Sequence, residues 1–188
     1  MSSRSRLFDA IGSQLVLAES LGEGFPKVGN EYEVRRILGG VGFGLVCEAE
    51  QLALKRRVAL KLFPLGGEGD AGVREALREA RSLAKLEHPG IVGVMDAGES
   101  ELVAAETLPC AYVEMQLVEG HDLRSWLEAE ARDAEAIVRL LIEAGRALDF
   151  AHARQIVHRD FKPENLMIDT TGRARVVDFG LAIAGERA

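Results

Sequence analysis

The sequence is poor in cysteine, in aromatic side chains and in positive charge. Its 188 residues include 2 Cys, aromatic residues make up 5% of the chain, and 23 Lys and Arg stand against 30 Asp and Glu. Two cysteines are too few for a disulfide framework or a four-cysteine zinc site, so we expect Cys47 and Cys110 to be buried thiols. The net charge of −7 argues against a nucleic-acid partner, because nucleic-acid-binding proteins normally carry a basic face.

Long apolar runs are also missing. A membrane-spanning helix needs roughly 18 or more consecutive apolar residues, whereas runs such as Ile91–Met95 have the length of a strand. No apolar signal-peptide core follows the Ser- and Arg-rich N-terminus. Leu7, Phe8, Ile11 and Leu15 instead have helical spacing and predict a short helix that docks on the rest of the protein. We therefore expect a cytoplasmic protein without a membrane span.

Predicted strands dominate the first part of the chain. Residues 1–30 are predicted to be an extension that ends in a glycine-rich loop. Alternating apolar side chains then predict strands over residues 31–38, 45–49 and 57–63. A glycine cluster lies at the tip of the first hairpin and consists of Gly39, Gly40, Gly42 and Gly44.

One predicted helix interrupts these strands. Asp70 is a suitable cap for it, and the His88-Pro89-Gly90 sequence ends it. Its apolar face consists of Val73, Ala76, Leu77, Ala80, Leu83 and Ala84. Two further strands are predicted at residues 91–95 and 111–117, and the acidic segment 96–110 between them is predicted to be a loop.

Helices dominate the second part of the chain. Asp122 precedes a predicted short helix, and Asp133 caps a predicted longer one. The apolar face of the longer helix consists of Ile137, Leu140, Leu141, Ala144, Leu148 and Ala151. Residues 166–168 and 175–177 then predict a hairpin around a turn at residues 170–172. Strands first and helices later indicate an α+β fold with two lobes.

The glycine cluster and one lysine suggest a phosphate site. A glycine-rich hairpin can present backbone N–H groups to phosphates because no Cβ blocks the approach, although an ordinary flexible hairpin fits the cluster equally well. Lys61 lies within an apolar strand, and a buried ammonium needs a partner. Glu79 on the predicted helix is one candidate partner and Glu75, one turn earlier, is the other; an edge-strand lysine with its amine in water is the alternative.

A dense polar cluster follows the long helix at residues 158–165. It offers Asp160, Lys162 and Asn165 within six positions, which suits a hydroxyl acceptor, an anion clamp and a metal ligand; a solvated charged turn is the alternative. Asp178 follows the last predicted strand. Its carboxylate is a suitable Mg²⁺ ligand, and a plain Asx turn is the alternative.

Together, and in this order, these motifs resemble the eukaryotic-type protein kinase family. The resemblance runs from residue 31 to the end of the chain. The residues that carry it are Val58-Ala59-Leu60-Lys61, Glu79, His88-Pro89, His158-Arg159-Asp160, Asn165 and Asp178-Phe179-Gly180. The lysine at position 162 is similar to the Ser/Thr class, and the sequence of residues 157–165 resembles bacterial Ser/Thr kinases in particular.

The resemblance implies a protein-kinase-like fold of two lobes. Residues 1–30 would be an N-terminal extension. Residues 31–118 would form a complete β-rich N-lobe with one inserted helix and the hinge. Residues 119–188 would form only the first part of the helical C-lobe, because the chain ends shortly after Asp178. We therefore expect an incomplete catalytic domain, in which the apolar face of the long helix would lack its usual cover.

The resemblance also assigns an activity, namely transfer of the ATP γ-phosphate to Ser/Thr hydroxyls of protein substrates. Asp160 would orient and deprotonate the substrate hydroxyl, and Lys162 would stabilise the transferring phosphate. Asn165 and Asp178 would bind Mg²⁺. His158 would have a structural role, in a packing column with Leu83 and Phe179, and Arg159 would be free to receive a phosphorylated activation segment.

The remaining site residues would hold the nucleotide. Lys61, aimed by Glu79, would hold the α- and β-phosphates, Met115 would lie at the back of the pocket, and Gln116 to Val118 would form the hinge. The residues that would sandwich the adenine are Leu38, Val46, Ala59 and Met167, of which Val46 and Ala59 could equally be core. The residues that would cover the phosphates are Gly39, Gly40, Val41, Gly42, Phe43 and Gly44.

One departure from the family pattern lies in this glycine loop. Aligning Gly44 and Val46 with the family pattern puts Gly39 first, and Val41 then occupies the position of the second glycine. Valine has a β-branched Cβ and resists positive φ. We therefore predict a looser fit over the phosphates than a glycine would allow.

Two other readings remain open. The first is a non-catalytic nucleotide-binding or interaction module that keeps the motif residues but does not phosphorylate peptides. The second is a dinucleotide-binding oxidoreductase, which needs a helix directly after Gly44, whereas residues 45–49 are strand-like.

Overall fold

A computed structural model describes residues 3–21, 24–41, 44–66 and 70–179. Two compact units make up the chain. Unit 1 contains the described parts of residues 1–78 together with residues 94–117, and unit 2 contains residues 79–93 together with the described part of 118–182. The fold is α+β, as the order of strands and helices predicted.

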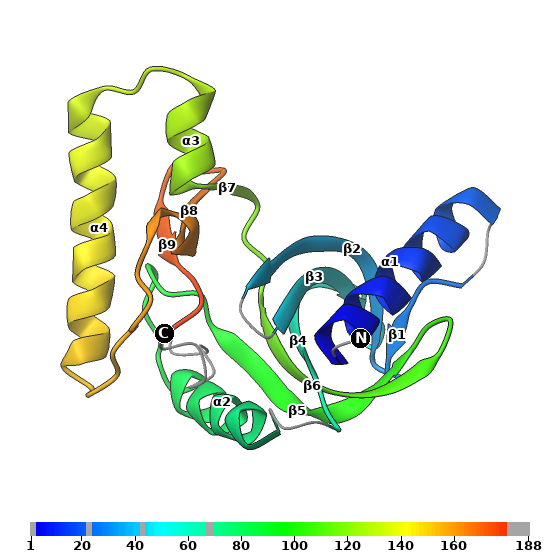
Figure 1. Cartoon of the computed structure of the whole chain (residues 1–188). Helices are drawn as coiled ribbons and strands as arrows, with labels where there is room; N and C mark the ends of the chain where they lie inside the picture. The colour runs from blue at the N-terminus through cyan, green and yellow to red at the C-terminus, as the bar shows by residue number, and fades with distance from the viewer. Residues whose placement is uncertain (1–2, 22–23, 42–43, 67–69, 180–188) are drawn as a thin grey trace. The chain divides into compact units, whose positions relative to one another are not determined.

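Unit 1 is a closed antiparallel β-barrel (Figure 1). Its strands close in the order β1-β2-β3-β4-β6-β5. Their bounds are β1 Lys27–Val28, β2 Tyr32–Val41, β3 Gly44–Gln51, β4 Arg56–Pro64, β5 Val94–Val103 and β6 Thr107–Gln116. The two-residue strand β1 closes the barrel because it pairs with β2 on one side and with β5 on the other. It lies in the segment predicted to be a loop, and two residues are too few for an alternating pattern to reveal.

Helix α1, Ser3–Leu21, packs into this barrel and confirms the predicted docking helix. Leu7, Ala10 and Ile11 are buried in the same apolar cluster as the inward-facing strand residues, such as Leu60 and Leu102. At the surface, Arg6 Nη2 donates to Glu106 Oε2 at 2.5 Å. The N-terminal helix is therefore part of the hydrophobic core of unit 1.

We expect Ile11→Ala to destabilise unit 1 by about 2 kcal/mol, because Ile11 is fully buried and its truncation leaves a cavity. This value is at the lower end of the usual destabilisation for such a truncation, because a surface helix can shift to fill part of the cavity. Urea unfolding followed by circular dichroism measures the change. Val16→Ala on the same helix is the control, since Val16 is 61% exposed; equal unfolding midpoints for the two variants would contradict a core role for α1.

The segment predicted to be a loop at residues 96–110 is mostly β-hairpin, so that prediction was wrong. Strands β5 and β6 pair from Val94↔Met115 to Val103↔Thr107, and the strand predicted at residues 91–95 begins only at Val94. The pattern is hidden because β5 is largely solvent-facing. Its acidic side chains Asp96, Glu99 and Glu101 occupy positions where charge is compatible with a strand.

Helix α2, Asp70–Leu83, spans the boundary between the two units. Asp70 begins the helix, and its carboxylate accepts a hydrogen bond from the backbone N–H of Gly66 at 3.1 Å. The predicted apolar face is buried at Val73, Ala76, Leu77, Ala80 and Leu83. Ala84 is exposed, contrary to the prediction, because the helix has already ended.

Unit 2 combines two helices with a small sheet (Figure 1). The helices are α3 Leu123–Ala129 and α4 Ala134–His152, and a 3₁₀ turn, η1, covers Pro163–Asn165. The strands β7 Gly120–Asp122, β8 Leu166–Asp169 and β9 Ala174–Val176 form an antiparallel sheet in that order. Asp133 caps α4 and β8 and β9 form a hairpin, both as predicted. Asp122, which was predicted only to precede the short helix, is the N-cap of α3.

The apolar face of α4 is partly covered within the described residues. Leu140, Ala144, Ala147 and Ala151 are buried. Leu141, which the prediction placed on the same face, is 46% exposed. The helix therefore packs with a narrower stripe than the sequence pattern indicated. No helix among the described residues is long and apolar enough to cross a membrane.

Candidate active site

The register of unit 1 places several of the predicted nucleotide residues on one face of its sheet. Gly39 lies opposite Val46, Val46 lies opposite Lys61, and Ala59 lies opposite Met115. Directly opposed residues of antiparallel strands point to the same face, and residues two apart on one strand do so as well. Gly39, Val46, Lys61, Ala59 and Met115 therefore share the face turned away from the apolar barrel interior, which holds Leu60 and its neighbours.

Lys61 is a buried cation on this face, with 3% of its surface exposed. Its Nζ lies 5.9 Å from the centre of the Phe63 ring, which is on the same face of β4. This placement agrees with a functional lysine, because a solvated edge-strand lysine would keep its amine exposed.

Two glycines of the predicted phosphate loop differ in the space around their Cα atoms. An added Cβ at Gly44 would lie 3.1 Å from the Phe63 ring and 3.2 Å from the carbonyl oxygen of Leu62, so tight packing favours glycine there. An added Cβ at Gly39 would meet nothing within 4 Å. Packing therefore does not explain Gly39, and open backbone at this point suits the approach of a phosphate.

The other predicted nucleotide residues are distributed as follows. Leu38, Gly40 and Val41 lie on β2, and Leu38 is 40% exposed. Gln116 ends β6, and Val118 is the first residue of the second segment of unit 2. Met167 is half-buried on β8. Gly42 and Phe43, as well as Gly180 of the Asp178-Phe179-Gly180 motif, lie outside the described residues.

Unit 2 brings the predicted catalytic side chains together. Lys162 Nζ lies 2.8 Å from Asp160 Oδ2, and Asn165 Nδ2 donates to the backbone oxygen of Asp160 at 2.8 Å and to its Oδ2 at 3.3 Å. The turn η1 makes this possible, because it folds the chain back between Lys162 and Leu166.

Charge pairing keeps this loop ionised. The hydrogen bond from Lys162 is the largest influence that lowers the pKa of Asp160, and the same bond raises the pKa of Lys162. Asp160 is therefore a carboxylate, and Lys162 an ammonium, at neutral pH. Both side chains stay accessible, with 43% and 39% of their surfaces exposed. The pair can thus offer a hydrogen-bond acceptor and an adjacent cation to an external hydroxyl and an external anion.

His158 joins this loop to the segment that carries Asp178. Its Nε2 donates to the carbonyl oxygen of Val177 at 2.8 Å, and the backbone N–H of Val177 donates to the carbonyl oxygen of Asn165 at 3.0 Å. Burial lowers the pKa of His158, so the ring is neutral at pH 7. It also lies 4.7 Å from the Phe179 ring, between centres. These contacts agree with the structural role predicted for His158.

Asn165 and Asp178 have the chemistry of a magnesium site. Asn165 is 3% exposed, and since its Nδ2 donates to Asp160, its Oδ1 is the atom suited to a metal. Asp178 adds a carboxylate from a backbone with φ of 59°, an uncommon conformation for a residue with a side chain. Mg²⁺ prefers such oxygen donors and usually completes its shell with substrate phosphates and water. Within the described ranges, no three His, Cys, Asp or Glu side chains gather as a metal cluster.

Glu79 of α2 has a partner that the sequence did not predict. Arg159 Nη1 donates to Glu79 Oε1 at 2.6 Å, with 57% and 25% of the two side chains exposed. Arg159, which the resemblance leaves free for a phosphorylated segment, is therefore ion-paired in this structure. The two residues are 80 positions apart, so no local signal in the sequence could have joined them.

A buried polar network in unit 1 was also missed. Glu114 is 1% exposed and accepts hydrogen bonds from Tyr32 Oη at 2.8 Å, Arg56 Nη2 at 2.8 Å and Gln51 Nε2 at 3.3 Å. The sequence offered one signal for this network, a single glutamate within the apolar run from Ala111 to Met115. A carboxylate buried in such a run needs hydrogen-bond partners. The network ties β2, β3, β4 and β6 together just before the predicted hinge.

Comparison with known proteins identifies the family of the chain. Residues 32–188 match the protein kinase domain family. The chain is 40% identical over 169 residues to the serine/threonine-protein kinase PknA of Mycobacterium tuberculosis (strain ATCC 25618 / H37Rv), with 87% of this chain and 39% of PknA covered. It is 35% identical over 163 residues to the serine/threonine-protein kinase PrkC of Bacillus subtilis (strain 168), with 84% of this chain and 24% of PrkC covered.

A third relative matches the chain to a similar extent. The serine/threonine-protein kinase PknB of Mycobacterium leprae (strain TN) is 36% identical over 161 residues, with 85% of this chain and 25% of PknB covered. The chain thus spans about two fifths or less of the length of these relatives. It belongs to the protein kinase domain family, and these relatives are bacterial serine/threonine-protein kinases.

Proposed function

We propose that this chain binds ATP with Mg²⁺ and transfers the γ-phosphate to Ser or Thr hydroxyls of protein substrates. The observation that carries the proposal is the joining of Asp160, Lys162 and Asn165 in one ionised loop of unit 2. A carboxylate, a cation and a side-chain amide in contact meet the needs of phosphoryl transfer, which relies on positioning and charge neutralisation more than on covalent chemistry.

Asp160 acts on the substrate hydroxyl in this proposal. Its ionised carboxylate accepts the hydrogen bond of the hydroxyl, orients the oxygen toward the phosphate and receives the proton as the oxygen bonds to phosphorus. Asn165 keeps the Asp160 side chain in place through the bond at Oδ2. Lys162, whose Nζ already lies beside Asp160, lies where it can neutralise charge on the transferred group.

The metal and phosphate contacts extend the same proposal. Asn165 Oδ1 and the Asp178 carboxylate would hold Mg²⁺, which neutralises phosphate charge when it is bound. Lys61, supported by Glu79, would hold the α- and β-phosphates. The residues that would cover the phosphates are Gly39, Gly40, Val41, Gly42, Phe43 and Gly44. The residues that would surround the adenine are Leu38, Val46, Ala59, Met115, Gln116, Val118 and Met167.

Domain limits and location follow from this assignment. Residues 1–30 would be an extension, residues 31–118 the N-lobe with the hinge and residues 119–188 a part of the C-lobe. The location would be cytoplasmic, where ATP is available and where the free thiols of Cys47 and Cys110 stay reduced.

The phosphate loop supports one prediction of its own. We expect Val41→Gly to bind ATP about threefold more tightly than the wild type, because a glycine lets the loop approach the phosphates without a β-branched side chain. Calorimetric titration with Mg·ATP measures the difference. AMP, which lacks the β- and γ-phosphates, is the control ligand and should bind both proteins alike. Equal ATP affinities would rule out Val41 as the cause of a loose loop.

The proposed function is tested with the purified 188-residue protein. Mg·ATP binding is measured by calorimetry, and phosphate transfer is measured with radiolabelled ATP and a general protein substrate such as casein. Binding together with transfer to Ser or Thr supports the kinase. Binding without transfer would indicate a nucleotide-binding module instead, and absence of both would overturn the proposal.

A further inference from the structure

Strand β9 is held on both of its edges. One edge pairs with β8, from Leu166↔Val176 to Ile168↔Ala174. On the other edge, the N–H of Val176 donates to the carbonyl oxygen of Gly90 at 2.8 Å, and the N–H of Val92 donates to that of Val176 at 2.9 Å. The strand is therefore central between the hairpin and the segment that follows α2. Asp178 lies two residues beyond it.

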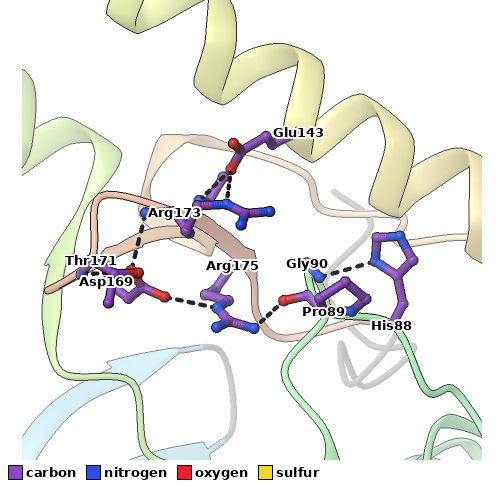
Figure 2. A network of polar contacts seen from close by, with 9 residues as sticks. His88, Pro89, Gly90, Glu143, Asp169, Thr171, Arg173 and Arg175 are labelled. Atoms are coloured by element: carbon purple, nitrogen blue, oxygen red, sulfur yellow. Dashed lines mark hydrogen bonds and ion pairs between the residues drawn. The ribbon is translucent and has the colours of Figure 1, made fainter.

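Arg175 on β9 and Arg173, directly before it, reach different partners (Figure 2). Arg175 reaches the carboxylate of Asp169 with Nε, at 2.9 Å, and the carbonyl oxygen of Pro89 with Nη1. Arg173 lies at the other side of Ala174 and donates to Glu143 of α4 at 3.2 Å. Arg175 thus joins the β8–β9 turn to the segment after α2, whereas Arg173 joins the strand to a helix.

Each partner of Arg175 is itself fixed. Asp169 accepts hydrogen bonds from the N–H and hydroxyl of Thr171 and from the N–H of Arg173, at 2.6 to 3.0 Å. Although partial burial opposes the effect, these bonds and that of Arg175 hold the pKa of Asp169 well below its usual range. On the other side, the His88 ring lies 4.8 Å from the Phe150 ring of α4, between centres. The guanidinium therefore bridges two rigid points.

The same strand fixes the backbone next to Asp178. Val177 donates to Asn165 and accepts from His158, so the residue before Asp178 is held by the loop that carries Asn165 and Asp160. A shift or twist of β9 would move Asp178 relative to Asn165. On the side of the α2 segment, Arg175 adds a side-chain anchor to the backbone hydrogen bonds that Val176 makes with Gly90 and Val92.

We propose that Arg175 is a positioning residue that fixes strand β9 between Asp169 and Pro89 and thereby sets the place of the Asp178 carboxylate relative to Asn165. The inference rests on the proposed function, because it assumes that Asp178 and Asn165 hold Mg²⁺. Arginine suits the task, since its planar fork can bond two acceptors at once with a fixed spacing. A glutamine keeps much of the chain length but cannot span both acceptors with a charge.

The quantity measured is nucleotide binding and its dependence on Mg²⁺, not phosphate transfer. ATP affinity is determined by calorimetry in EDTA and over a series of Mg²⁺ concentrations, for the wild type and for Arg175→Gln. In Arg175→Gln, we expect the Mg²⁺ concentration that gives half of the gain in ATP affinity to rise about fivefold. This is less than the ~10-fold or more that is usual for groups that touch a metal ligand directly. ATP affinity in EDTA should stay within about twofold, because the phosphate and adenine contacts are unchanged.

Arg173→Gln is the matched control. It removes an arginine two positions away, directly before β9, with an ion pair of its own to Glu143, and should leave the Mg²⁺ requirement unchanged. Arg175→Lys should recover only part of the wild-type value, because its ammonium keeps the charge but lacks the planar fork that bonds both acceptors. If Arg175→Gln does not fold, as judged by circular dichroism, Asp169→Asn takes its place, since it removes the charged anchor and keeps Arg175.

Each outcome decides the matter. A raised Mg²⁺ requirement in Arg175→Gln or Asp169→Asn, but not in Arg173→Gln, supports the positioning role. An unchanged requirement in the Arg175 variant, or equal changes in both arginine variants, overturns it while the proposed function stands. Wild-type protein that binds ATP equally with and without Mg²⁺ would overturn both.

Discussion

Asp160→Asn should lower the rate of phosphate transfer about 1,000-fold, within the range that general-base groups contribute, and should leave Mg·ATP affinity within about twofold. Asparagine keeps the size of the side chain and can still accept one hydrogen bond, from Lys162 or Asn165. It cannot take a proton from the substrate hydroxyl. The loss should therefore appear in kcat, because the interaction that is removed is made in the transition state.

The control for Asp160→Asn is the same exchange at Asp133. That residue caps α4 in the same unit, and asparagine caps a helix as well as aspartate does, so Asp133→Asn should keep full activity and stability. Thermal unfolding of both variants would show whether the fold is intact. Transfer by Asp160→Asn at more than a tenth of the wild-type rate would remove Asp160 from the catalytic role.

The grouping of the proposed catalytic residues in one loop could be predicted from the sequence because their contacts are local. Asp160, Lys162 and Asn165 span six positions, and one 3₁₀ turn is sufficient to bring them into contact. The helix caps Asp122 and Asp133 were predictable for the same reason, since a cap acts within three residues. Pairings between distant segments had no such signal, as the ion pair between Glu79 and Arg159 illustrates.

Solvent exposure explains the largest error in the predicted fold. Strand β5 buries little of its length, so apolar alternation, the usual signal of a strand, is absent from residues 96–103. Strand β4, which is buried along most of its length, was predicted almost to the residue. Periodicity therefore located the strands of the barrel in proportion to how much of each strand is buried.

The arrangement of unit 1 gives the predicted nucleotide face a rigid support. The interior of the barrel is apolar except for Glu114 and its donors, and α1 fills the same core. Because neighbouring residues of a strand point to opposite faces, Glu114 lies behind the face that carries Met115. The predicted hinge, Gln116 to Val118, begins directly after Met115. A change at Glu114 should therefore act on the stability of the whole barrel.

Glu114→Leu should lower the free energy of unfolding of unit 1 by about 1–3 kcal/mol, the usual cost of leaving a buried donor without its acceptor. Tyr32 would keep a buried hydroxyl without its acceptor, and burial together with Glu114 already raises the pKa of that phenol. With an m-value of about 1–3 kcal/mol per molar urea, the midpoint should fall by about 1 M. Urea unfolding followed by circular dichroism measures it.

Two further variants separate the buried network from the loss of a charge in general. Glu50→Ala removes a carboxylate that pairs with Arg35 near the surface, where 31% of the Glu50 side chain is exposed, and should cost about 1 kcal/mol or less. Tyr32→Phe combined with Glu114→Leu should recover part of the loss, since replacing both buried partners by apolar groups leaves no unsatisfied donor between them, and Arg56, 41% exposed, can turn to water. If the double variant is less stable than Glu114→Leu alone, or if Glu50→Ala is equally destabilising, the barrel does not depend on the Tyr32–Glu114 hydrogen bond.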